Sequence, residues 1–143
     1  KPIRVGNVIE NGQTVGYSGD FYEDSKETDW ATIGKEAGMP QEEIDKLFTN
    51  EKTTVTKRLR RVFEFSDEGL RRSVVVSGAN RISLNFVQYI DWKANGVRGR
   101  DLSVLPEKVR AFIARIERVS GLPVVLIGTG AHNDDIVDLE RKE

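Results

Sequence analysis

The sequence contains no cysteine and only one histidine, His132. Without cysteine, disulfide frameworks and thiolate metal sites are excluded, and a cytoplasmic location is weakly favoured. The histidine stands beside Asn133, Asp134 and Asp135 but lacks the further partners that a metal site needs. No apolar run approaches the roughly 20 residues of a membrane helix, and no charged and then apolar leader opens the chain. We therefore expect neither a membrane span nor a metal site in this chain.

The sequence also lacks an excess of charge of one sign, since it contains 22 Lys and Arg residues and 23 Asp and Glu residues. The resulting net charge of −1 provides no overall field that would attract nucleic acid or an anionic membrane. No aromatic stacking platform accompanies the basic residues Arg58, Arg60, Arg61, Arg71 and Arg72. Nucleic-acid binding is therefore the hypothesis with the least support, and any anion site must be local.

Hydrophobic residues make up 38% of the sequence, which is enough for one modest core in 143 residues. The expected helices cover residues 30–37, 40–48, 66–77 and 106–120, and the expected strands cover 3–5, 59–65, 82–90 and 123–127. Gly, Asn, Ser and Asp are frequent in residues 6–27, which indicates a long loop. The succession of helix, glycine, strand and glycine turn predicts an α/β fold, a partial sheet with flanking helices.

Two of the expected helices have a clear apolar face. The second helix is expected to bury Ile44, Leu47 and Phe48. The last helix starts after Pro106, stops at Gly121 and has a longer apolar face, formed by Val109, Phe112, Ile113, Ile116 and Val119. We expect this last helix to cover the strand that follows it.

The segment with the strongest local chemistry is Thr53-Thr54-Val55-Thr56-Lys57-Arg58-Leu59-Arg60-Arg61. Hydroxyl groups and backbone N–H groups in a loop, backed by guanidinium groups, can bind a carboxylate through charge-assisted hydrogen bonds. In an extended segment, Arg58 and Arg60 point to one face and Arg61 to the other. The local alternative is a solvated basic strand edge that discourages edge-to-edge pairing, and such edges are common.

The turn Gly128-Thr129-Gly130-Ala131 follows an apolar strand and offers exposed amides and close backbone approach, as nucleotide sites at strand ends require. It is neither a complete GxGxxG motif nor a P-loop, and by itself such a turn is more often a tight connection.

Five segments in this order resemble the adenylosuccinate synthetase family: Arg4-Val5-Gly6-Asn7, 54–61, 77–91, 105–124 and Gly128-Thr129-Gly130. The resemblance touches nearly the whole chain, and it depends on the order and spacing of the segments rather than on any single motif. It implies that the chain is the C-terminal portion of a larger ligase fold of the P-loop type, in an enzyme of purine nucleotide biosynthesis.

The resemblance implies that L-aspartate is joined to C6 of a purine monophosphate, IMP or dGMP, after a nucleoside triphosphate phosphorylates the 6-oxygen. On the family pattern, Thr56, Arg58 and Arg60 would bind aspartate. Val5, Gly6 and Arg58 would bind the purine monophosphate.

The donor nucleotide would be bound by Phe86, Gln88, Gly128, Thr129 and Gly130. The usual family pattern has Lys and Asp at the positions of Phe86 and Gln88, and these favour guanine. A glutamine amide both donates and accepts, so ATP or dATP becomes plausible beside GTP. The strings Leu84-Asn85-Phe86 and Gly19-Asp20-Phe21-Tyr22 resemble the bacteriophage branch, the 2-aminoadenylosuccinate synthetases, which are associated with dGMP and ATP or dATP.

The glycine-rich phosphate loop, the catalytic Asp and the catalytic His that the family carries in its N-terminal portion are not found in this chain. The chain opens at Lys1 without methionine, on residues that have strand composition. We therefore expect the missing portion to hold Mg²⁺, and we expect this chain alone to be inactive. The resemblance also implies a homodimer for the full-length enzyme, located in the cytoplasm, or in the host cytoplasm for a phage protein. The alternative function is a non-catalytic nucleotide-binding or scaffold module.

Overall fold

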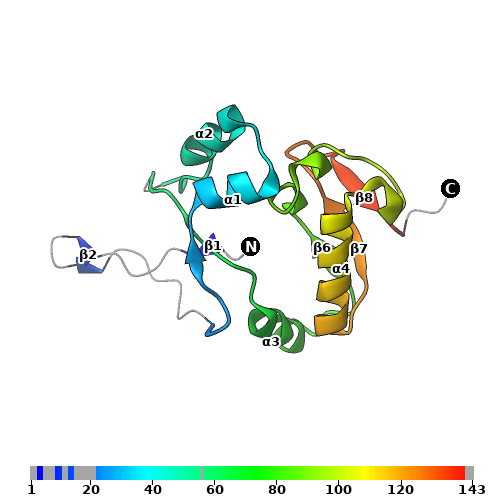
Figure 1. The fold of residues 1–143 in the computed structure, drawn as a ribbon. Helices are drawn as coiled ribbons and strands as arrows, with labels where there is room; N and C mark the ends of the chain where they lie inside the picture. Colours follow the sequence, from blue (N-terminus) through cyan, green and yellow to red (C-terminus); the bar gives the residue numbers. More distant parts are fainter. Residues whose placement is uncertain (1–2, 5–8, 11–12, 15–21, 56, 141–143) are drawn as a thin grey trace.

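The computed structural model describes the chain except for residues 1–2, 5–8, 11–12, 15–21, 56 and 141–143 (Figure 1). Its helices are α1 (Trp30–Ala37), α2 (Gln41–Asn50), α3 (Asp67–Ser77) and α4 (Glu107–Ser120). Three 3-10 helices are also present: η1 (Val87–Tyr89), η2 (Trp92–Ala94) and η3 (Leu102–Val104). The strands are β1 (Ile3–Arg4), β2 (Ile9–Glu10), β3 (Gln13–Thr14), β4 (Glu27–Thr28), β5 (Arg61–Phe63), β6 (Ile82–Leu84), β7 (Val124–Gly128) and β8 (Ile136–Asp138).

The C-terminal half is a small mixed sheet covered by α4, which runs alongside β7 in Figure 1. The strand order is β6-β7-β8, where β6 and β7 are parallel and β8 is antiparallel to β7. Apolar side chains from α4 and the sheet form one buried cluster, to which Val109, Ile113, Ile116, Val124, Ile127 and Val137 belong. This arrangement confirms the α/β class that the order of elements predicts.

Helix α4 follows its sequence pattern closely. Pro106 precedes the first turn, where backbone N–H groups have no partner within the helix, so a proline costs no hydrogen bond there. Gly121 ends the helix with a φ of 70°. Residues Val109, Ile113 and Ile116 are buried at the expected spacing. The spacing in the sequence therefore predicts both the limits of this helix and the face that it buries.

The N-terminal half has a separate core, made by α1 and α2 packed against β5. Asp29 caps α1 by accepting a hydrogen bond from the Thr32 backbone N–H at 2.9 Å, and Gly38 ends it with a φ of 73°. A Cβ atom at Gly34 would lie 2.6 Å from Ile44 Cγ1, so glycine permits the close contact of the two helices. The buried cluster contains Trp30, Ile33, Ala37, Met39, Ile44, Leu47 and Val62. These contacts fix the position of the chain immediately after α2.

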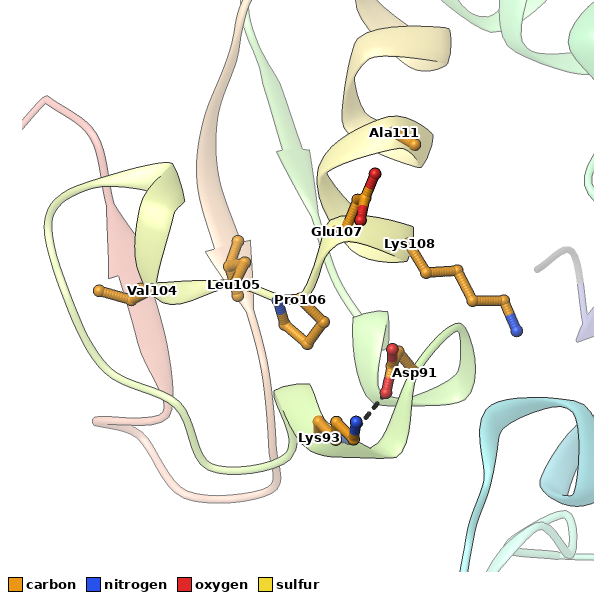
Figure 2. A pocket seen from close by; sticks show the side chains of 8 residues that line it. All are labelled: Asp91, Lys93, Val104, Leu105, Pro106, Glu107, Lys108 and Ala111. Atoms are coloured by element: carbon orange, nitrogen blue, oxygen red, sulfur yellow. Dashed lines mark hydrogen bonds between the residues drawn. The ribbon is translucent and has the colours of Figure 1, made fainter.

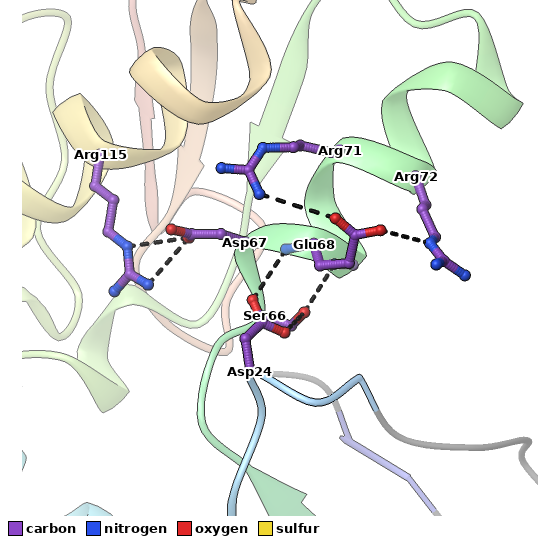
Figure 3. A network of polar contacts seen from close by, with 8 residues as sticks. Asp24, Ser66, Asp67, Glu68, Arg71, Arg72 and Arg115 are labelled. Atoms are coloured by element: carbon purple, nitrogen blue, oxygen red, sulfur yellow. Dashed lines mark hydrogen bonds and ion pairs between the residues drawn. The ribbon is translucent and has the colours of Figure 1, made fainter.

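Helix α3 packs against α4 and has no fully buried residue. Its N-terminus is held by a polar network, shown in Figure 3. The Ser66 hydroxyl accepts from the Gly69 backbone N–H at 2.7 Å and donates to Asp24 Oδ1 at 2.6 Å, while Asp24 Oδ2 accepts from the Glu68 backbone N–H at 3.0 Å. Arg115 of α4 pairs with Asp67 at 3.0 Å. The network ties the loop before β4 to the helix.

Four expectations differ from the structure. Residues 6–27 were expected to form a loop, but the range contains the antiparallel strands β2 and β3, which are too short for a sequence pattern to reveal. The strand expected over residues 82–90 ends at Leu84, because Phe86 adopts a left-handed backbone with a φ of 66° and η1 begins next. Phe48 is 42% exposed, so it lies outside the apolar face of α2. Strand β8 was not expected, since its three residues follow a polar loop and carry too short a pattern. Among the described residues, no helix combines the length and apolar character required to cross a membrane.

Candidate functional site

The predicted aspartate loop connects α2 to β5 and closes as a narrow hairpin. Lys52 and Leu59 form an antiparallel bridge, and the Thr53 backbone N–H donates to the Arg58 carbonyl at 2.8 Å. The Arg58 backbone N–H donates in turn to Thr53 Oγ1 at 3.0 Å. Lys57 takes a left-handed conformation with a φ of 55°, which allows the tight turn. The backbone bonds therefore present the turn residues together at the end of the hairpin.

The arginines of this hairpin have different surroundings. Arg60 lies 3.5 Å from Glu51 Oε2 through its Nη1, and both side chains are largely covered. Arg61 forms two hydrogen bonds of 2.6 Å with Glu27 on the neighbouring strand β4. Its hydrogen bonds to Glu27 raise the pKa of Arg61 and lower the pKa of Glu27. Arg58 is half-buried. Thr56, Val5 and Gly6 lie outside the described residues.

The backbone of Arg60 is fixed on both sides by the N-terminal core. Its N–H donates to the Glu51 carbonyl at 2.8 Å, and its carbonyl accepts from Trp30 Nε1 at 2.8 Å. These bonds place Arg60 at the base of the hairpin, immediately before β5.

The predicted donor-nucleotide residues follow the carboxyl ends of two neighbouring strands of the C-terminal sheet. Because β6 and β7 are parallel, with Leu84 opposite Ile127, their carboxyl ends lie side by side. A Cβ atom at Gly128 would clash with Asn85 Oδ1, so the two strand ends approach each other closely at this position. A Cβ atom at Gly130 would lie 2.5 Å from Asp135 Oδ2. A side chain at either glycine would therefore displace the side chain of Asn85 or Asp135.

Thr129, between these glycines, is fully buried. Its hydroxyl donates to the Val97 carbonyl at 2.7 Å, and its N–H donates to the Asp135 carbonyl at 2.9 Å. The side chain of Thr129 thus holds the turn against the loop after η2, and its backbone holds the turn against the loop before β8.

Gln88 is 9% exposed and lines a cavity of about 360 Å³ between α2 and the turn after β7. Ala131, His132 and Asp135 line the same cavity from the turn side. Within the described part of the chain, Gln88 Oε1 is a buried oxygen without a hydrogen-bond partner. A buried acceptor left unpaired is costly, so this oxygen is suited to accept from a group that enters the cavity.

Phe86 lies on the other side of Tyr89. The residue is 54% exposed, and its ring stacks on the Tyr89 ring with the centroids 5.9 Å apart and an angle of 6° between the planes. Phe86 lines a second cavity of about 370 Å³, which Tyr89 shares and which contains Asn85, Lys108 and Arg115. Tyr89 also lines the cavity of Gln88. The structure therefore brings Gln88 and the turn after β7 into one cavity, whereas Phe86 faces a neighbouring one.

Two residues that the sequence did not single out connect these places. Glu51 is 8% exposed and uses both carboxylate oxygens, Oε1 to accept from the Tyr89 hydroxyl at 2.6 Å and Oε2 to pair with Arg60. Burial, and then the hydrogen bond to Glu51, raise the pKa of Tyr89, so its hydroxyl stays protonated as a donor. No local pattern signals this pair, because 38 positions separate Glu51 from Tyr89.

A further hollow, of about 760 Å³, lies at the start of α4 and is shown in Figure 2. It is lined by Asp91, Lys93, Val104, Leu105, Pro106, Glu107, Lys108 and Ala111, which include none of the predicted site residues. Asp91 accepts from the Lys93 backbone N–H at 3.0 Å and caps η2. Asp91 therefore has a structural role here.

Across the described residues, no group of three or more His, Cys, Asp or Glu side chains could hold a metal ion. His132 is exposed, and its backbone N–H donates to Asp135 Oδ2 at 3.0 Å. This hydrogen bond lowers the pKa of Asp135, which also pairs with Arg98 at 3.1 Å. The acidic residues near His132 thus organise the loop before β8.

Known proteins resemble the chain over most of its length, although no family model matches it. An adenylosuccinate synthetase of Thermococcus sibiricus is 40% identical over 72% of this chain and 30% of its own length. An N6-succino-2-amino-2'-deoxyadenylate synthase of Salmonella phage PMBT28 is 35% identical over 83% of this chain and 26% of its own length.

One solved structure is similar as well, that of a cyanophage S-2L succinoaminodeoxyadenylate synthetase bound to dGMP and to dATP as an energy donor. It matches with a TM-score of 0.62 and 28% identity, over 98% of this chain and 31% of that chain. The chain thus spans about a third of the length of these proteins. The sequence is similar to adenylosuccinate synthetases and to a phage synthase of the same kind, and the fold is similar to that of a further phage synthetase. Over most of its residues, therefore, the chain belongs to the adenylosuccinate synthetase family.

Proposed function

We propose that residues 1–143 are the C-terminal portion of a ligase of purine nucleotide biosynthesis, which joins L-aspartate to C6 of a purine monophosphate. The family membership supports this proposal, and the buried, unpaired Gln88 oxygen beside the turn after β7 is the observation that carries this chain's part in it. A nucleoside triphosphate transfers its γ-phosphoryl group to the 6-oxygen. The amine of aspartate then forms a bond to C6, and phosphate leaves with that oxygen.

The hairpin after α2 would bind aspartate. Arg58 and Arg60 supply guanidinium groups that pair with carboxylates in a bidentate way, and Thr56 adds a hydroxyl group. The backbone bonds of Arg60 to Glu51 and Trp30 support this role, because they fix the point on the chain from which the guanidinium group extends. With its carboxylates held, the amine of aspartate can be directed at C6.

Val5, Gly6 and Arg58 would bind the purine monophosphate, which we propose to be IMP or dGMP. Arg58 belongs to both groups of residues, so it would lie where aspartate and the acceptor nucleotide meet. The cyanophage relative, whose solved structure contains dGMP, motivates the second of these acceptors.

The edge of the β6-β7-β8 sheet would bind the donor nucleotide, through Gln88, Phe86 and the turn Gly128-Thr129-Gly130. The Gln88 amide offers one acceptor and one donor, which together match the amino group and a ring nitrogen of adenine. Guanine presents two donors, N1–H and N2–H, on one edge, and a single amide oxygen leaves one of them unpaired. We therefore propose ATP or dATP as the donor in preference to GTP.

The remaining parts of the reaction would come from the rest of the longer protein. Mg²⁺, the phosphate loop and the acid–base residues belong to that portion, which in this proposal acts in a cytoplasmic homodimer. Mg²⁺ there would neutralise charge on the transferred phosphoryl group. The isolated chain is expected to form no succinylated nucleotide.

The full-length protein that contains this chain tests the proposal directly. It is supplied with L-aspartate, Mg²⁺, either IMP or dGMP, and ATP, dATP or GTP, and the succinylated nucleotide is measured. Adenine donors are expected to exceed GTP in kcat/KM by about tenfold, because an unpaired buried donor costs roughly 1–3 kcal/mol. A tenfold preference for GTP would contradict the role of Gln88 alone, whereas no product with any pair would contradict the proposed function.

A further inference from the structure

A buried carboxylate joins the proposed aspartate hairpin to the proposed donor-nucleotide edge. Glu51 follows α2 directly and is 8% exposed. Its two oxygens face different halves of the molecule, Oε2 toward Arg60 in the hairpin at 3.5 Å and Oε1 toward Tyr89 in η1 at 2.6 Å. A carboxylate removed from water depends on such partners, so a change at one oxygen alters the interaction at the other.

Tyr89 extends this connection to Phe86. The two rings stack at 5.9 Å and are nearly parallel, so Phe86 depends on Tyr89 for support on its inner face. Phe86 presents its ring to solvent from a left-handed backbone, which is uncommon for a bulky residue and requires support from the surrounding structure.

A second, aromatic contact runs between the same places. The Trp30 ring meets the Tyr89 ring edge to face at 5.7 Å, and Trp30 Nε1 donates to the Arg60 carbonyl at 2.8 Å. Arg60 is thus held through its guanidinium group by Glu51 and through its backbone by Trp30, and both of these residues contact Tyr89.

We propose that Glu51 and Tyr89 are positioning residues that hold the Arg60 guanidinium group for aspartate. This inference rests on the proposed function. Neither residue would touch the reacting atoms. Their effect is on the orientation of Arg60, because Glu51 balances the charge of Arg60 while the Tyr89 hydroxyl fixes the carboxylate.

The decisive variant is Tyr89→Phe in the full-length protein, assayed with IMP or dGMP and ATP. It removes only the hydroxyl group and keeps the ring that stacks on Phe86 and Trp30. The KM for aspartate is expected to rise about tenfold, the size of one lost hydrogen bond to a charged group. The KM for ATP and the kcat are expected to stay within about twofold of the wild-type values. The variant changes neither the ring that supports Phe86 nor the groups that react.

Glu51→Gln provides an independent measurement. The amide can still accept from the Tyr89 hydroxyl but carries no charge for Arg60, so the KM for aspartate is again expected to rise by about tenfold. The double variant is expected to show a smaller rise than the product of the two single effects, since both act through one carboxylate.

Two matched controls separate positioning from a general loss of structure. Tyr22→Phe deletes a hydroxyl from a ring that lies beside Gly69 and Arg72, far along the chain from the hairpin. Glu42→Gln neutralises an exposed carboxylate of α2 that pairs with Lys46. Both controls are expected to keep the wild-type KM for aspartate.

The inference is overturned if the KM for aspartate stays within twofold of wild type in Tyr89→Phe, or if the KM for ATP rises equally. Should Glu51→Gln not fold, the isosteric Tyr89→Phe decides the question by itself. Absence of ligase activity in the wild-type protein would instead overturn the proposed function, and the inference with it.

Discussion

In the C-terminal half, α4 lies on the β6-β7-β8 sheet, and the cluster between them consists of apolar side chains. In the N-terminal half, the smaller cluster of α1 and α2 ends at polar anchors, where Trp30 Nε1 and the Glu51 carboxylate hold the hairpin. Apolar packing is non-directional and tolerates small shifts, whereas each hydrogen bond fixes one group in one orientation. The C-terminal half therefore provides stability and a strand edge, and the N-terminal half provides orientation.

The largest expected effect is on the stability of the C-terminal core. Ile113→Ala is expected to lower the free energy of unfolding by about 2–5 kcal/mol, because it removes buried methyl groups and leaves a cavity. Ile44→Ala, in the smaller core, is expected to lower the free energy of unfolding by a smaller amount, near the lower end of that range. Urea denaturation measures both, with Val75→Ala, at a side chain 81% exposed, as the control. A larger loss in Ile44→Ala would contradict the comparison.

The next effect concerns binding in the N-terminal half. Arg58→Ala and Arg60→Ala in the full-length enzyme are each expected to lower kcat/KM for aspartate, since each removes charged hydrogen bonds. The loss corresponds to about 1.5–3 kcal/mol of transition-state stabilisation per variant. The KM for the donor is expected to change far less. Steady-state kinetics with aspartate and donor varied separately measure this, with Arg118→Ala, on the exposed side of α4, as the control. Equal rises in both KM values would count against the assignment.

A smaller effect is expected at the polar anchor itself. Trp30→Phe keeps an aromatic ring but leaves the Arg60 carbonyl without its donor, at a cost of about 1–2 kcal/mol in unfolding free energy. Thermal or urea denaturation measures the change. Trp92→Phe, at a partly buried ring packed against the same core, is the matched comparison and is expected to cost less. If the two variants are equal, packing rather than the hydrogen bond explains the role of Trp30.

The smallest effect is a pH dependence at the start of α3, where the two halves meet. The hydrogen bond from Ser66, followed by that from the Glu68 backbone, lowers the pKa of Asp24. A lowered pKa means that the stabilisation is complete above the ordinary aspartate value of 3.8 and is lost as the pH falls through the lower folded value. Asp24→Asn is therefore expected to lower the melting temperature slightly at pH 7 and by less at about pH 2. A difference that is the same at both pH values would exclude ionisation as the cause.

Much of the fold follows from the sequence by itself. The 3.6-residue spacing of Val109, Ile113 and Ile116 determines the buried face of α4, and Gly38 and Gly121 end helices where the chain needs positive φ. Ser66 caps α3 as its position predicts. These features are local, so a short window of sequence contains all the groups that cause them. The order of the segments was likewise sufficient to predict the family.

Only the tertiary structure decided how the site residues are arranged. The strand expected through Gln88 breaks at Phe86, because the chain turns where β6 meets β7, and this turn sends Phe86 and Gln88 into different cavities. Glu51, Tyr89 and Arg60 come together across 38 positions of sequence. Their bonds depend on how the two cores pack, and no periodicity records a contact between side chains on separate elements. The sequence alone thus determined the main helices and the family, while the packing of the two halves determined which side chains contact one another.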